Sequence, residues 1–128
     1  MKCAILGAGA IGTLVAAQLS QIDEVELLLC SRREQALALA AIGLRLETES
    51  MPTSIPASRW TVVEFGETLP SHWAAATDVV ILCSKTNASE ELSAVAARLL
   101  SSEGFTISLQ NGISNENILA GYCGSNRT

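Results

Sequence analysis

The chain has 128 residues, of which 48% are hydrophobic and only 4% are aromatic. A chain of this length forms one domain, and a core poor in aromatic residues is built from Ala, Leu, Ile and Val, as in layered α/β proteins. The net charge of −5 argues against binding to nucleic acid or to anionic membranes, so a small-molecule ligand is expected.

The first third of the chain predicts alternating strands and helices. Residues 2–6 form a short apolar run, and residues 10–20 carry apolar side chains at helical spacing. Residues 25–30 are nearly all apolar, as a parallel strand buried on both faces requires. Residues 33–41 predict a short helix that Gly43 ends, which completes a βαβ unit.

The pattern weakens over residues 44–77, where three prolines interrupt it. We expect a hairpin-like, irregular region there, with short strands at residues 44–46 and 61–63. A buried strand follows at residues 78–83, and a helix with one apolar face at about residues 88–100.

The last part of the chain predicts a strand at residues 105–109 and one or two helical turns at residues 115–120. Residues 122–124 resemble the lead-in to another strand. Together the elements predict a Rossmann-type α/β fold, with a doubly wound, mainly parallel sheet and helices on both faces. Ligands bind at the carboxyl ends of such strands. Four segments with distinctive residues follow predicted strands: residues 7–12, 31–33, 84–87 and 110–112.

The segment after the first strand matches the pattern GxGxxG with the residues Gly7, Ala8, Gly9, Ala10, Ile11 and Gly12. Gly7 permits a sharp turn, Gly9 lets the backbone approach a pyrophosphate, and Gly12 lets the helix lie against the strand. Phosphates then accept hydrogen bonds from the exposed N–H groups at the helix start. The context of strand, turn and helix favours dinucleotide binding over a tight turn with a structural role only.

The residues after the second strand indicate which dinucleotide binds. NAD-binding domains place an acidic residue there for the ribose hydroxyls, but this chain has Ser31 and Arg32. Arg32 is placed to bind the 2′-phosphate of NADP, and Ser31 could add a hydroxyl donor. The alternative is that Arg32 and Arg33 are solvated charges at a helix start, although cations are unfavourable at that end of a helix.

Lys85 and Asn111 each follow a predicted strand. The ammonium of Lys85 could contact a ribose, a phosphate or a substrate carboxylate, and Asn111 occupies the equivalent place after the next strand. The alternatives are a solvated lysine and an ordinary Asn-Gly turn with Gly112, but their joint placement at one sheet edge favours function.

Other polar or aromatic residues are expected to have structural roles. We assign packing or solvent exposure to His72, a capping or solvated role to Asp78, and coverage of one sheet face to Trp60 and Trp73. The four cysteines lie far apart with no CxxC pair, so small buried side chains are expected rather than a metal site or a disulfide. No apolar run is long enough to cross a membrane and no signal peptide is evident, which favours a cytoplasmic protein.

These motifs, taken in order, resemble the N-terminal domain of the ketopantoate reductase (2-dehydropantoate 2-reductase) family. The resemblance extends over nearly the whole chain and rests on GxGxxG, on Ser31-Arg32, on Lys85 after its strand, and on Gln110-Asn111-Gly112. It implies NADPH-dependent reduction of 2-dehydropantoate to pantoate, in pantothenate biosynthesis, with Lys85 and Asn111 near the nicotinamide and the keto-acid substrate.

In that family a helical C-terminal domain supplies the general-acid lysine and further substrate contacts. Residues 1–128 are therefore expected to form the NADP-binding Rossmann domain only, as a fragment that binds NADPH with little or no turnover. An oligomer could form through the missing domain. Two alternatives stay open: a related enzyme acting on another 2-keto or β-hydroxy acid, and a non-catalytic nucleotide sensor, which would typically carry an acidic residue after the second strand.

Overall fold

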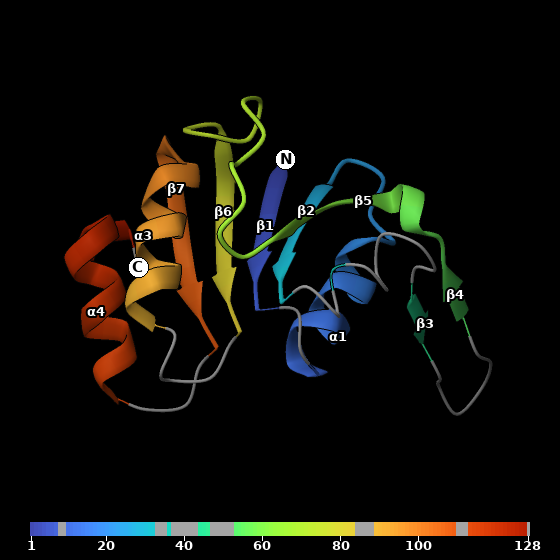
Figure 1. Cartoon of the computed structure of the whole chain (residues 1–128), viewed down its shortest axis with the longest axis horizontal. Coiled ribbons are helices and arrows are strands. Elements are labelled where there is room, and N and C mark those ends of the chain that lie inside the picture. The colour runs from blue at the N-terminus through green and yellow to red at the C-terminus, as the bar shows by residue number, and fades with distance from the viewer. Residues whose placement is uncertain are drawn as a thin grey trace.

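The computed structural model describes residues 1–7, 10–32, 36, 44–46, 53–83, 89–109 and 113–127. The named elements, shown in Figure 1, are β1 (Lys2–Leu6), α1 (Ala10–Leu19), β2 (Glu26–Ser31), β3 (Leu44–Leu46), β4 (Thr53–Ile55), η1 (Ala57–Arg59), β5 (Trp60–Glu64), β6 (Thr77–Leu82), α3 (Ser89–Leu99), β7 (Leu100–Ser108), α4 (Ile113–Cys123) and η3 (Ser125–Arg127).

Five strands form one sheet in the order β5-β2-β1-β6-β7. The first strand lies in the centre, β2 and β5 follow on one side, and β6 and β7 follow on the other. All four neighbouring pairs are parallel. This strand order is that of a doubly wound nucleotide-binding sheet, so the predicted Rossmann-type fold is confirmed.

Helices cover both faces of the sheet. Side chains alternate along β1, so Cys3 and Ile5 pack in the layer of α1 while Ala4 and Leu6 pack in the layer of α3 and α4. None of these four side chains is more than 3% exposed. Figure 1 shows α3 and α4 beside β7 and α1 near the lower ends of β1 and β2. Burial on both faces is the reason that the central strands have nearly continuous apolar sequences.

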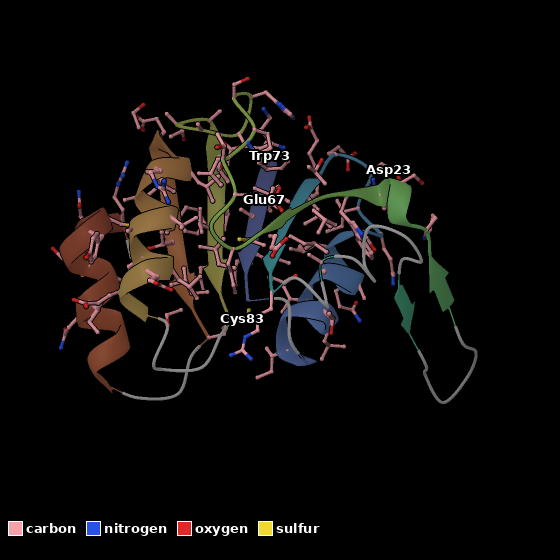
Figure 2. All side chains as sticks on the ribbon, viewed as in Figure 1. Asp23, Glu67, Trp73 and Cys83 are labelled. Atoms are coloured by element: carbon pink, nitrogen blue, oxygen red, sulfur yellow. The ribbon has the colours of Figure 1, made fainter. Side chains whose placement is uncertain are left out.

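The two tryptophans fill opposite layers. Trp60 packs in the α1 layer, and Trp73 packs in the α3 and α4 layer with only 1% of its surface exposed. The ammonium of Lys2 lies 5.4 Å from the centre of the Trp73 ring, at the end of the sheet where β1 begins. Figure 2 shows Cys83 at the opposite end. The tryptophans therefore pack on the sheet as expected, but they cover opposite faces rather than one face.

The region between residues 44 and 77 differs from its prediction in two respects. The expected strand at residues 44–46 is present as β3, but it pairs antiparallel with β4, a strand that the sequence did not predict. The expected strand at residues 61–63 is part of β5, and β5 does not belong to that pair. It lies in the main sheet beside β2, with Thr61 opposite Leu28 and Glu64 opposite Ser31. The sequence pattern identifies the strand but contains no information about its partner.

The predicted strand lead-in at residues 122–124 is wrong. Tyr122 and Cys123 belong to helix α4, and Gly124 has a φ of 98° while its N–H donates to the carbonyl of Ala120 at 2.8 Å. A glycine in the left-handed conformation is a common helix C-cap, so Gly124 ends this helix. The predicted helix at residues 33–41 lies outside the described residues, apart from Ala36, which is helical.

Strand β7 begins at Leu100, well before the predicted residue 105. Leu100 lies opposite Thr77 and Phe105 lies opposite Val79, so the residues between them form an irregular bulge. A Cβ atom on Gly104 would lie 2.7 Å from the Thr77 carbonyl oxygen, and the bulge therefore depends on a glycine there. Within the described residues, no helix is long and apolar enough to span a membrane.

Candidate functional site

Four parallel strands end at the same edge of the sheet. The pairing puts Leu6 level with Cys30 and with Leu82, and Leu82 level with Ser108. Hydrogen bonds continue one residue beyond these pairs: the N–H of Gly7 donates to Cys30 O at 2.8 Å, that of Cys83 to Leu6 O at 2.9 Å, and that of Leu109 to Leu82 O at 2.9 Å. The strands that precede the four segments singled out by the sequence therefore end side by side.

The turn after β1 requires its glycines. Gly7 has a φ of 90°, a backbone conformation that residues other than glycine rarely adopt. A Cβ atom on Gly12 would lie 2.5 Å from the carbonyl oxygen of Gly7, so the first turn of α1 packs directly against the end of β1. These are the two structural roles predicted for Gly7 and Gly12. Ala8 and Gly9 lie outside the described residues.

The start of α1 suits an anion. Ala10 is its first residue, and the first turn contains no acidic side chain. The N–H groups of a first helical turn have no partners within the helix, and the helix dipole places partial positive charge there. Ile11 is about half exposed, at 51%, beside this turn. The N–H donors of this first turn and the tight turn at Gly7 suit a dinucleotide pyrophosphate, which the backbone must approach closely.

Ser31 and Arg32 come at the end of β2, next to the glycine turn. Ser31 is fully buried, and within the described residues its hydroxyl donates a long hydrogen bond of 3.4 Å to the Arg32 carbonyl. Arg32 is exposed, so its guanidinium is accessible to a ligand at this edge. Of the two residues, Arg32 is the one whose side chain is presented to solvent. Arg33 lies outside the described residues.

Lys85, Asn111 and Gly112 also lie outside the described residues. Cys83 and Leu109, the last described residues before them, are at the same sheet edge as Gly7. Cys83 and Leu109 follow β6 and β7, which lie on the other side of β1 from β2 and Arg32.

The cysteines at this edge are poor nucleophiles. Burial raises the pKa of Cys30 to about 12, with a smaller contribution from the negative charge of Glu67, and burial raises the pKa of Cys83 to about 11. Both thiols are therefore neutral near pH 7. In the described part of the chain, no group of three or more His, Cys, Asp or Glu side chains could hold a metal ion.

Sequence reasoning missed two carboxylates at this edge. Glu64 ends β5 directly opposite Ser31, and the N–H of Phe65 donates to the Ser31 carbonyl at 3.0 Å. The Oε1 atom of Glu67 accepts a hydrogen bond of 2.9 Å from the Glu64 N–H. The sequence predicted the strand at residues 61–63 but not its pairing with β2, and it is this pairing that brings the two acids to the site.

Comparison with solved structures supports the same fold. The chain superimposes on 2-dehydropantoate 2-reductase from Geobacter metallireducens GS-15 with a TM-score of 0.76 and 28% identity, covering 99% of this chain and 39% of that one. For a PanE/ApbA family ketopantoate reductase from Ralstonia eutropha JMP134, the TM-score is 0.75 and the identity 28%, with coverage of 97% and 39%.

A third similar structure is D-mandelate dehydrogenase in a ternary complex with NADH and anilino(oxo)acetate. Its TM-score is 0.77 at 24% identity, with 95% of this chain and 37% of that chain covered, so it supports the fold alone. This chain spans less than two-fifths of the length of each of these three proteins.

No curated protein sequence matches the chain significantly. The family model for ketopantoate reductase PanE/ApbA matches residues 3–128, which is nearly the whole chain. The chain therefore belongs to the ketopantoate reductase PanE/ApbA family of oxidoreductases and has the Rossmann-type fold of an NAD(P)-binding domain.

Proposed function

We propose that this chain is the NADPH-binding domain of an enzyme that reduces 2-dehydropantoate to pantoate. The observation that carries the proposal is the contact between Gly12 and the Gly7 carbonyl, where a Cβ atom would lie at 2.5 Å. This contact holds the start of α1 at the end of the central strand, where a pyrophosphate could accept its N–H bonds. Family membership supports a nicotinamide dinucleotide.

The proposed ligand would be held at the carboxyl edge of the sheet. Gly9 and the N–H groups at the start of α1 would hold its pyrophosphate, and Arg32 at the end of β2 would hold its 2′-phosphate. Ser31 is buried, so we assign it a supporting role at the end of β2 rather than a contact with solvent-facing phosphate. The nicotinamide half then extends towards β6 and β7.

Lys85 and Asn111 are proposed to act at the nicotinamide end. A reduced nicotinamide supplies the hydride for reduction of a ketone. The ammonium of Lys85 would hold the carboxylate of the keto acid or a ribose hydroxyl. The Asn111 amide would donate to the same region, with Gly112 allowing the chain to turn away. Both residues would orient the two reactants, which accounts for part of the catalysis.

A fluorescence titration with NADPH and NADH tests the nucleotide assignment. Arg32→Gln should weaken NADPH binding about 10- to 100-fold, because a charge-assisted hydrogen bond to phosphate is lost. NADH binding should change little. Arg98→Gln is the matched control, since Arg98 is also exposed but lies near the end of α3. The proposal fails if the wild-type chain binds neither nucleotide, or if Arg32→Gln weakens both equally.

Substrate choice needs a separate measurement. NADPH oxidation would be followed with 2-dehydropantoate, pyruvate, 2-ketoisovalerate and phenylglyoxylate, both for this chain and for the full-length gene product. We expect this chain to bind NADPH with little or no turnover, and the full-length product to prefer 2-dehydropantoate. Preference of the full-length product for another keto acid would retain the family and the nucleotide but overturn the proposed substrate.

A further inference from the structure

The end of β5 brings negative charge to the adenosine side of the proposed nucleotide site. Glu64 is the last residue of β5, and its Cα is paired with that of Ser31 at the end of β2. Neighbouring strands lie about 4.8 Å apart, so the two residues are direct neighbours. Glu64 is half-buried, which restricts the positions that its carboxylate can reach.

The side chains of Glu64 and Ser31 lie on the same face of the sheet. Trp60 and Val62 of β5 pack in the α1 layer, as do Leu27 and Leu29 of β2. Because side chains alternate along a strand, Glu64 and Ser31 project to this face as well. The carboxylate of Glu64 is therefore beside the residues that precede Arg32, where the adenosine ribose of the proposed ligand would lie.

The carboxylate of Glu67 is held by the backbone of Glu64 rather than by β2. The Phe65 N–H points towards β2, because it donates to the Ser31 carbonyl. The Glu64 N–H therefore points away from β2, and it is this N–H that donates to Glu67 Oε1 at 2.9 Å. The Glu67 charge still reaches the end of β2, since it contributes to the raised pKa of Cys30, after burial.

We propose that Glu64, with a weaker contribution from Glu67, opposes the 2′-phosphate and limits the preference for NADPH that Arg32 would give. In NAD-binding Rossmann domains an acid after the second strand disfavours this phosphate. Here the second strand ends in Arg32, and the neighbouring strand supplies the acid. The inference rests on the proposed function, because it assumes that a nicotinamide dinucleotide binds at this edge.

The size of the effect follows from charge and distance. A carboxylate and a phosphate about 8 Å apart in water repel each other enough to change affinity about two- to fivefold, given the phosphate charge near −2. The effect should fall with distance and with added salt, because the Debye length is about 10 Å at 0.1 M. Removing the acid charge should therefore strengthen binding of NADPH specifically.

The test uses three isosteric variants of the whole chain: Glu64→Gln, Glu67→Gln and Glu26→Gln. Glu26 is the control, because it is exposed at the opposite end of β2, five residues before Ser31 and so about 16 Å away. Glutamine at position 67 keeps an oxygen that can accept the Glu64 N–H bond. Dissociation constants for NADPH and NADH would be measured at low and at high salt, with circular dichroism to check the fold.

We expect Glu64→Gln to tighten NADPH binding about two- to fivefold at low salt, Glu67→Gln to tighten it less, and Glu26→Gln to leave it unchanged. NADH binding should stay constant or weaken in Glu64→Gln. If both nucleotides bind the wild type but the ratio of their affinities is the same in all variants, this inference is overturned and the proposed function stands. If neither nucleotide binds the wild type, both are overturned.

Discussion

Replacement of Gly12 by alanine tests the contact on which the candidate site depends. Gly12 lies in the first turn of α1, and an added Cβ would lie 2.5 Å from the Gly7 carbonyl oxygen and 3.4 Å from a methyl carbon of Ile5. The oxygen belongs to the backbone at the end of a fully paired central strand, so it cannot move without disturbing β1 or displacing the helix.

The expected free-energy change is the sum of two opposing effects. Alanine has the higher helix propensity, which favours the variant by about 1 kcal/mol. Overpacking of a tight contact costs about 1 to 3 kcal/mol, and a contact with a backbone atom belongs at the upper end. Gly12→Ala should therefore lower the free energy of unfolding by about 2 kcal/mol and the melting temperature by about 8 °C.

Gly121→Ala is the matched control, because Gly121 also lies in a helix but has no atom within 4 Å of the added Cβ. Helix propensity alone should stabilise this variant by up to about 1 kcal/mol. Urea denaturation followed by circular dichroism compares both variants with the wild type. Equal or greater stability of Gly12→Ala than of the wild type would refute the close approach of α1 to β1.

Two further predictions concern the core and the buried thiols. Leu119→Ala in α4 should lower the free energy of unfolding, measured by urea denaturation, by about 2 to 4 kcal/mol, because Leu119 is fully buried. Tyr122→Ala should change it by no more than about 0.5 kcal/mol, because Tyr122 is 48% exposed. Similar losses in the two variants would contradict the orientation of α4. Burial raises the pKa of Cys30 from 9.0 to about 12. The neutral thiol therefore makes its full contribution to the free energy of unfolding below pH 9, and this contribution is lost as the pH rises towards 12. The free energy of unfolding should therefore fall more steeply above pH 9 in the wild type than in Cys30→Ala, and parallel curves would disprove this contribution.

The local elements of this protein follow from short stretches of its sequence. The apolar runs of β1, β2 and β6 indicate strands buried on both faces, and the spacing of Gly7 and Gly12 indicates a strand followed closely by a helix. These patterns arise because a strand or a helix turn depends on side chains only a few residues apart. The edge on which Gly7, Arg32 and Cys83 meet could also be predicted, because parallel strands in this fold end together.

Interactions between distant residues needed the three-dimensional arrangement. Strand β5 was identifiable at residues 61–63, but its pairing with β2 joins residues about thirty positions apart, and no local pattern encodes such a partner. That pairing is what brings Glu64 beside Ser31. Likewise, residues 122–124 are compatible with a strand lead-in when read alone, and the packing of α4 against α3 selects the helix instead.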